Sequence, residues 1–260
     1  MLLENKVALV TGIGPAMGRS IARQFAREGA RLALAARREP RLEAVAEEIR
    51  AAGGEVLAVP TDITDRAACA HLVAMTIECF GQIDILVQNG HFDGDYKIVA
   101  DSDPDDWRAI MEVNLFGALH LVQLVTPSMR RRGDGRIVLI NTGASTDPPP
   151  TLGAYAASKA ALASLVRTIA VELGPEGIRA NGVQLGPVKG ENWDSWIESG
   201  SKEAGMTPEE FERDQCKDVP LRMVPTADQC AGTVLYLASD LSQPVTGQSV
   251  AVNGGRWFVS

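Results

Sequence analysis

The feature that most constrains the fold is an alternation of short apolar runs with helical patterns. The apolar runs are Val7–Val10, Arg31–Ala35, Val56–Val59, Ile83–Val87, Arg136–Ile140, Ile178–Leu185 and Ser249–Val252. The helical patterns are about Arg19–Glu28, Glu39–Ala52, Arg66–Phe80, Pro104–Arg131, Tyr155–Leu173 and Ala227–Ala238. Strands separated by helices pair in parallel, and continuous apolar runs are typical of strands covered on both faces. The sequence therefore predicts an α/β fold with one doubly wound parallel sheet of about seven strands, flanked by helices.

One stretch, residues 189–225, breaks this alternation. It is polar and acidic but contains Trp193, Trp196 and Phe211. We interpret it as a lid inserted between the sixth and seventh strands, within a single domain that spans residues 1–260. Thr207 followed by Pro208 indicates a helix start inside the lid. The two tryptophans fit either a small satellite core or an apolar cover over a bulky substrate.

Composition narrows the possible partners. Lys and Arg total 25 and Asp and Glu total 33, so the formal net charge is −8. Because phosphate binding needs concentrated positive charge, we expect no nucleic-acid partner and no attraction to anionic membranes. No apolar run approaches the roughly 18 residues of a membrane span, and the first residues do not resemble a signal peptide. We therefore expect no membrane association.

Cysteine and histidine positions predict no metal site. No two cysteines have the spacing of a zinc or dithiol motif, which indicates reduced thiols and a cytoplasmic location. The cysteines are Cys69, Cys79, Cys216 and Cys230, and the scattered histidines are His71, His91 and His120. A role for His91 in its local turn is the simpler interpretation.

A glycine-rich turn joins the first strand to the first helix. It reads Thr11-Gly12-Ile13-Gly14-Pro15-Ala16-Met17-Gly18. Glycine allows a tight turn and lets a pyrophosphate approach the backbone, and the helix N-terminus supplies N–H donors. In a strand–turn–helix context this turn predicts a Rossmann-type dinucleotide site that includes Gly12, Gly14, Met17 and Gly18.

The end of the second strand indicates which dinucleotide is bound. An acid near this point usually holds the ribose 2′-hydroxyl of NAD, whereas arginine accommodates the 2′-phosphate of NADP. This chain has Arg37 and Arg38 and lacks the acid, which favours NADP(H) over NAD(H). An exposed arginine pair at a helix start is the alternative. Asp62 is a candidate for the adenine amino group or, alternatively, a cap for the next helix.

Tyr155 and Lys159 carry the strongest catalytic signal. They are four residues apart on a predicted helix, so they share one face. A free tyrosine has a pKa of about 10, and a nearby ammonium favours the phenolate. This pair can therefore provide a general acid/base.

Together these motifs resemble those of the classical short-chain dehydrogenase/reductase family over nearly the whole chain. The resemblance rests on the turn at 11–18, Asp62, the turn at 88–91, Asn114, Tyr155, Lys159 and the stretch 252–255. It implies an NAD(P)-dependent oxidoreductase of alcohols or ketones, assembled as a homotetramer or homodimer. It also implies that Tyr155 is the acid/base, that Lys159 binds the nicotinamide ribose and lowers the tyrosine pKa, and that Asn114 holds a helix irregularity and a relay water. Further cofactor contacts are implied for Ile63, Asn89 and Val188.

Three positions depart from the family pattern. The usual serine is Thr142, which keeps a hydroxyl but adds a methyl group, and Ser145 is a second candidate for the hydroxyl. The turn after the fourth strand reads Gln88-Asn89-Gly90-His91, and the sixth strand is followed by Gly186-Pro187-Val188. These changes bear on substrate orientation and cofactor fit.

The sequence thus predicts an oxidoreductase that interconverts a secondary alcohol and a ketone with Asn114, Thr142, Tyr155 and Lys159. The tryptophans of the lid favour a bulky apolar substrate, such as a terpenoid, steroid, aryl compound or acyl thioester. A non-catalytic dinucleotide-binding sensor or scaffold is the main alternative, and an isomerase that retains its cofactor is another.

Overall fold

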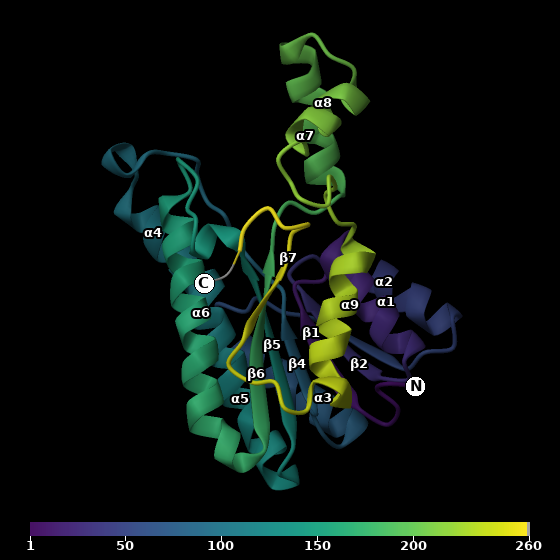
Figure 1. Ribbon diagram of the computed structural model, residues 1–260. Helices are drawn as coiled ribbons and strands as arrows, with labels where there is room; N and C mark the ends of the chain where they lie inside the picture. The colour runs from purple at the N-terminus through teal and green to yellow at the C-terminus, as the bar shows by residue number, and fades with distance from the viewer. Residues whose placement is uncertain (259–260) are drawn as a thin grey trace.

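A computed structural model describes residues 1–258, and in these residues the strands form one parallel seven-stranded sheet (Figure 1). The order across the sheet is β3-β2-β1-β4-β5-β6-β7. The strands are β1 (Val7–Thr11), β2 (Arg31–Ala36), β3 (Val56–Pro60), β4 (Ile85–Gln88), β5 (Gly135–Thr142), β6 (Ile178–Leu185) and β7 (Ser249–Val252). The predicted fold class is therefore confirmed.

The helices follow the predicted order with small shifts at their ends. They are α1 (Met17–Arg27), α2 (Glu39–Ala51), α3 (Arg66–Phe80), α4 (Pro104–Met111), α5 (Gly117–Arg132), α6 (Gly153–Leu173), α7 (Glu191–Ala204), α8 (Pro208–Gln215) and α9 (Ala227–Ala238). A five-residue π-helix, Glu112–Phe116, joins α4 to α5. It divides the long helix that the sequence predicts for this region.

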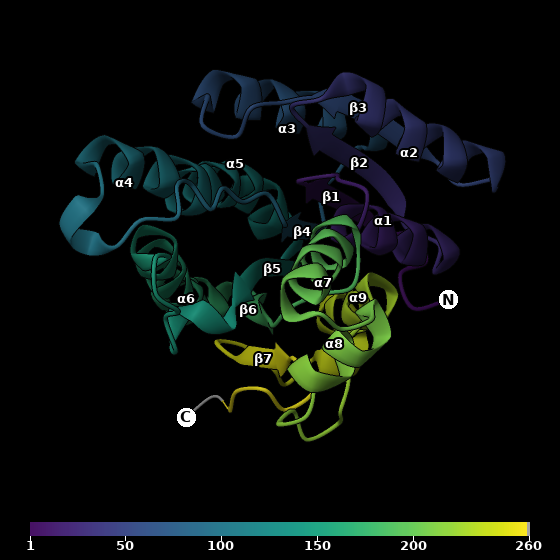
Figure 2. The same ribbon diagram turned by 90° about the horizontal axis from the view of Figure 1, so that it is seen from above.

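Both faces of the sheet are covered, which explains why the strands are apolar throughout. Helices α1, α2 and α9 cover one face of the sheet (Figure 2), and Phe25, Leu42 and Val234 of these helices are buried there. Helices α3, α5 and α6 bury Leu72 and Val125, among others, on the other face. Successive residues of β1 alternate between these two cores. Such a sheet leaves only the ends of its strands free to carry a site.

The helical run Pro104–Arg132 has the length and apolar composition of a membrane span. Its best 18-residue window has a mean hydropathy of 1.4. A count of uninterrupted apolar residues misses this window because polar residues such as His120 interrupt the run. Leu121, Val125 and Met129 of this run are buried in the sheet–helix core, where a long apolar helix of a globular protein ordinarily packs.

The lid is more regular than the sequence indicates, because most of residues 189–225 form α7 and α8. These helices stand above the carboxyl ends of the strands (Figure 1). Thr207 and Glu210 form the capping box that begins α8. Trp193 and Ile197 are buried with Cys216 and Val224 in a separate small core, so the satellite-core interpretation holds for Trp193.

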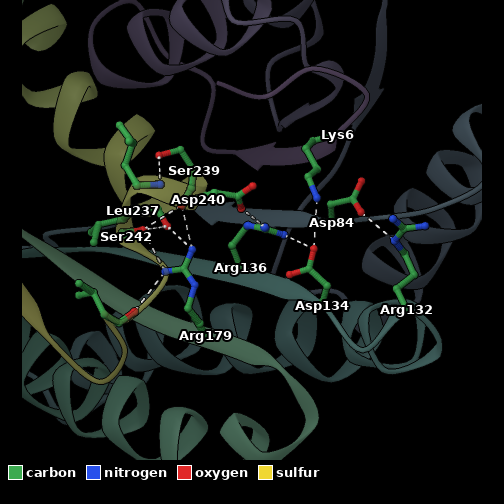
Figure 3. Close-up of polar contacts among 12 residues, drawn as sticks. Lys6, Asp84, Arg132, Asp134, Arg136, Arg179, Leu237, Ser239, Asp240 and Ser242 are labelled. Atoms are coloured by element: carbon green, nitrogen blue, oxygen red, sulfur yellow. Dashed lines mark hydrogen bonds and ion pairs between the residues drawn. The ribbon is translucent and has the colours of Figure 1, made fainter. Parts of the chain in front are cut away.

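At the amino-terminal ends of the strands, opposite the lid, charged side chains link neighbouring strands and the end of α9 (Figure 3). Asp134 lies between Lys6, whose Nζ is 3.2 Å away, and Arg136, which also reaches Asp240. Arg179 donates hydrogen bonds to the carbonyl oxygens of residues 237, 239 and 245 and to a serine hydroxyl. These contacts join the starts of β1, β5 and β6 to the end of α9, far from the lid.

The ionised carboxylate of Asp134 is expected to make the stability of the fold depend on pH in the acid range. Burial alone would raise the pKa of Asp134, but hydrogen bonds from Arg136 and Lys6 outweigh this effect and hold the pKa below its usual value. The ionised carboxylate therefore stabilises the fold above the unfolded-state pKa of about 3.9, and this contribution is lost as pH falls toward the lower folded-state value. Asp134→Asn should lower the free energy of unfolding by about 1 kcal/mol at neutral pH and flatten its decline in acid.

Urea unfolding across an acidic pH series measures both effects. Asp105→Asn is the matched control, because the Asp105 side chain is 83% exposed on α4. If the free energy of unfolding of Asp134→Asn fell with decreasing pH as steeply as that of the wild type, the stabilising role of the Asp134 carboxylate would be contradicted.

Candidate active site

A large cleft opens where the carboxyl ends of the strands meet the lid. Its volume is about 1190 Å³, which exceeds the roughly 300–1,000 Å³ typical of a site for one small ligand. The sheet order reverses between β1 and β4, and the loops after these two strands diverge at this point. The cleft therefore has room for a dinucleotide and a second molecule.

The glycine turn closes one side of the cleft. Gly12 has a φ of +70°, and a Cβ there would lie 2.2 Å from the backbone nitrogen of Gly90. A Cβ on Gly18 would lie 2.5 Å from the Gly12 carbonyl oxygen, whereas one on Gly14 would meet nothing within 4 Å. Asn89 Nδ2 donates a hydrogen bond of 2.7 Å to the Gly12 carbonyl. The turn is thus packed against β4 on one side and open on the other, which fits a pyrophosphate at the start of α1.

Arg37 and Arg38 line the cleft, as the sequence predicts, and Arg41 joins them from the first turn of α2. All three are exposed, and none forms an ion pair with another described residue. Sequence motifs do not single out Arg41, because Arg37 and Arg38 precede the helix and only the folded turn brings Arg41 of α2 to the same cleft. Three uncompensated guanidinium groups fit a phosphate group better than a neutral ribose.

Asp62 and Ile63 line the cleft after β3, and Val188 lines it after β6. The Asp62 carboxylate accepts hydrogen bonds from the backbone nitrogen and the hydroxyl of Thr64, at 3.0 and 2.8 Å. Asp65, not Asp62, caps α3. The capping interpretation of Asp62 is therefore wrong.

Thr142, Tyr155 and Lys159 meet in the same cleft, from the end of β5 and the first turns of α6. Lys159 Nζ lies 5.9 Å from the centre of the Tyr155 ring and donates a hydrogen bond of 3.0 Å to the Ile140 carbonyl. Only 2% of Lys159 is exposed, and this burial lowers its pKa to about 8 despite the opposing charge of Asp93. The hydrogen bond to Ile140 holds the Lys159 amine in one position, and the lowered pKa of about 8 lies close to neutral pH.

The pKa of Tyr155 is raised in this structure. Burial is the main cause, and the Asp93 carboxylate adds to it, whereas the hydrogen bond with the Thr142 hydroxyl acts in the opposite direction. Lys159 is not among the causes of this shift, so the lowering of the Tyr155 pKa that the resemblance implies is not seen here. Tyr155 is therefore protonated at neutral pH and ready to donate a proton.

Asn114 lies behind the site rather than in it. It is buried in the π-helix, where its Oδ1 accepts from the backbone nitrogen of Phe92 at 2.8 Å. Its Nδ2 donates to the Phe92 carbonyl and to Ser158 Oγ, which in turn donates to the Tyr155 carbonyl. The predicted helix irregularity is present at this position, and it connects the loop after β4 to the catalytic helix.

The two candidate hydroxyls differ in their surroundings. Thr142 lines the cleft and interacts with Tyr155. Ser145 Oγ donates to the Thr142 carbonyl at 2.7 Å and accepts from Gln184 Nε2 at 3.1 Å. The Ser145 hydroxyl thus donates its proton to a carbonyl within the turn, whereas Thr142 Oγ1 only accepts a bond of 3.3 Å from the Ala144 nitrogen, which favours Thr142 as the hydroxyl that contacts a substrate.

His91 and Asp93 were not expected to contribute to the site. The His91 ring lies edge-on to Tyr155, with centroids 6.5 Å apart, and its pKa is lowered by burial and by Lys159. Asp93 influences the pKa of His91, Tyr155 and Lys159. Only the folded path of the loop after β4 brings these side chains to α6. Among residues 1–258, no group of three or more His, Cys, Asp or Glu side chains is arranged to hold a metal ion.

Comparisons with known proteins agree with this fold and site. A family profile described as enoyl-(acyl carrier protein) reductase matches residues 12–256. The chain is 33% identical to 7alpha-hydroxysteroid dehydrogenase of Escherichia coli strain K12, over 97% of this chain and 94% of the relative. It is 30% identical to dehydrogenase/reductase SDR family member 4 of Sus scrofa, over 97% of this chain and 88% of the relative.

Solved structures give the same result. NAD⁺-bound xylitol dehydrogenase superposes with a TM-score of 0.88 at 30% identity, covering 98% of this chain and all of that one. A doubly wound sheet with this glycine turn and a Tyr–Lys pair in its cleft defines a dinucleotide-dependent oxidoreductase. The chain belongs to the classical short-chain dehydrogenase/reductase family, and it acts with NAD(P) on hydroxyl or keto groups.

Substitution of the two hydroxyl residues tests which one contacts the substrate. Thr142→Ala should lower kcat by about 10- to 100-fold, because one hydrogen bond to the reacting oxygen is lost, while cofactor affinity changes little. Ser145→Ala is the matched control and should change kcat less than Thr142→Ala. Steady-state kinetics and cofactor titration measure these effects, and a larger loss with Ser145→Ala would reverse the assignment.

Proposed function

We propose that this protein is an NADP(H)-preferring reductase or dehydrogenase that interconverts a ketone and a secondary alcohol, with Tyr155 as the general acid/base. The observation that carries the proposal is the placement of Thr142, Tyr155 and Lys159 in one cleft with three unpaired arginines. The names of similar proteins, which include a hydroxysteroid dehydrogenase and a xylitol dehydrogenase, are consistent with alcohol–ketone chemistry.

The glycine turn and the arginines fit NADP(H), which when bound supplies or accepts the hydride. Arg37, Arg38 and Arg41 would hold the 2′-phosphate, and Asp62 and Ile63 would line the adenine side. The open face of Gly14 and the start of α1 would receive the pyrophosphate.

Tyr155 and Thr142 would hold the carbonyl oxygen between their hydroxyl groups. In reduction Tyr155 donates its proton to the developing alkoxide, and in oxidation its phenolate removes the proton from the alcohol. The raised pKa of Tyr155 suits the reductive direction at neutral pH, because the proton is present before reaction. Lys159 is fixed by the Ile140 carbonyl and provides the positive charge that stabilises the phenolate after proton transfer.

Tyr155→Phe removes the acid/base and leaves the ring in place. We expect kcat to fall by about 100- to 10,000-fold, because proton transfer in the transition state is lost. NADPH affinity should remain within a few-fold, as measured by fluorescence titration. Tyr236→Phe, on α9, is the control and should retain full turnover. Unchanged turnover in Tyr155→Phe would refute the mechanism, and NADPH binding by the wild type without turnover of any alcohol or ketone would favour the sensor alternative.

Arg37→Gln tests the cofactor preference. NADPH affinity should fall by about 10-fold or more, because a charge-assisted hydrogen bond to the 2′-phosphate is lost. NADH affinity should change little. Arg50→Gln is the control, because Arg50 lies on α2 and pairs with Glu43 outside the cleft. Tighter binding of NADH than of NADPH by the wild type would contradict the preference.

A further inference from the structure

The part of the cleft beneath the lid has its own cation. Besides the three arginines near the second strand and the buried Lys159, the cleft is lined by Arg256, from the segment after β7. Trp196 and Gln215 of the lid line the same cleft, and the Gln215 carbonyl contacts Arg256. No dinucleotide-binding motif includes these residues, so they belong to the space left for the second molecule.

Arg256 is held in place without a counterion. Its Nη2 donates a hydrogen bond of 3.0 Å to the Gln215 carbonyl, and its backbone nitrogen donates to the Asn253 carbonyl at 3.2 Å. Within residues 1–258 no carboxylate lies within ion-pair distance of its guanidinium. Glu191 lines the cleft but does not pair with it. Arg256 keeps most of its N–H donors for a ligand.

The other lysine near the cleft is already neutralised. Lys189 pairs with Glu212 at 2.7 Å, and the same carboxylate accepts a hydrogen bond from Trp193 Nε1. Lys159 is committed to the Ile140 carbonyl. Arg256 is therefore the cation available to an anion beneath the lid.

The segment that carries Arg256 connects the lid to the catalytic turn. The next residue, Trp257, packs on Gly143, where a Cβ would lie 2.2 Å from the indole ring. Gly143 directly follows Thr142, the hydroxyl assigned to the reacting oxygen. The backbone of Leu221, at the end of the lid, donates to the Gly254 carbonyl at 3.0 Å. Arg256 thus lies between the catalytic turn and α8.

An aromatic surface lines the same cleft as this cation. Trp196 is 46% exposed although it lines the cleft, and its ring centre is 5.0 Å from that of Trp193 and 5.5 Å from that of Phe211. Trp193 is buried in the core of the lid, so Trp196 presents a supported apolar face. Such a face binds apolar groups, and a guanidinium binds a carboxylate through paired N–H donors.

We propose that the substrate combines an apolar body with a terminal carboxylate, which stacks on Trp196 and pairs with Arg256 while its carbonyl or hydroxyl group reaches Thr142 and Tyr155. This proposal rests on the proposed function and adds the class of substrate. In a chain of net charge −8 an anionic group gains no general attraction, so recognition depends on this local cation.

The kinetic test uses ω-(acetylphenyl)alkanoates of increasing chain length and the methyl ester of each. For wild type, kcat/KM for the acid should exceed that for the ester at the chain length that spans the cleft. Arg256→Gln should reduce this ratio by about 10- to 100-fold, with the ester rate little changed. Arg256→Lys should restore part of the ratio. Arg213→Gln, an exposed position of α8 outside the cleft, should leave it unchanged.

Trp196→Ala separates the apolar contact from the charge. It should lower kcat/KM for acids and esters by a similar factor, through KM. Thermal unfolding and NADPH titration verify that each variant is folded, because Arg256 lies away from the dinucleotide residues. An acid-to-ester ratio that Arg256→Gln leaves unchanged would overturn the carboxylate assignment while the oxidoreductase function stands.

A binding measurement tests the carboxylate site independently of turnover. Unreactive ω-phenylalkanoates and their amides are titrated against the tryptophan fluorescence of the protein. Carboxylates should bind about 10-fold or more tightly than amides, and Arg256→Gln should abolish the difference. Absent turnover with this carboxylate preference would refute the proposed function but support the site. Equal binding of both ligands to wild type would refute the site.

Discussion

The close contact between the loops after β1 and β4 is the constraint on which the site depends. The backbones of Gly12 and Gly90 approach so closely that no side chain fits between them, and Asn89 fixes the distance with a hydrogen bond to the Gly12 carbonyl. Neighbouring parallel strands force the two loops to start side by side. Because helices must cover both faces of the sheet, the chain leaves β1 toward one side and β4 toward the other. The cleft is the space that this divergence creates.

Burial of Lys159 is the second requirement of the site. Desolvation shifts the protonation equilibrium of Lys159 toward the neutral amine. The charge of Asp93 and the hydrogen bond to the Ile140 carbonyl oppose this shift. The same desolvation raises the pKa of the neighbouring tyrosine. Burial therefore shifts the pKa of Tyr155 upward and the pKa of Lys159 downward, so it favours the neutral form of each group. Asn114 and Ser158 hold the helix that carries both groups.

Much of this arrangement could be predicted from the sequence. The runs that became β6, β7 and α9 have the predicted bounds because apolar pattern and local propensity agree there. The glycine turn, Tyr155 and Lys159 were found because their function needs fixed spacing along the chain. The sequence does not predict α7, because its apolar residues face only the small core of the lid and its composition is otherwise polar.

Other residues could not be found from spacing. His91 and Arg256 line the cleft although they lie 165 residues apart in the sequence, so only the folded chain brings them to one place. Asp62 and Asp65 both precede α3, and the sequence does not show which of them caps the helix; the observed hydrogen bonds assign the cap to Asp65 and place Asp62 in a turn with Thr64. The raised pKa of Tyr155 reflects desolvation, which sequence does not report.

The lid has consequences for how a protein of this kind diversifies. Its core of Trp193, Ile197, Cys216 and Val224 is separate from the two cores that cover the sheet. The charged contacts around Asp134 and Arg179 join the amino-terminal ends of the strands (Figure 3), at the end of the sheet opposite α7 and α8 (Figure 1). A mutation in the core of the lid therefore leaves the two cores that hold the sheet unchanged. Selection for a new substrate can act on α7 and α8 while the chemistry beneath them is inherited intact.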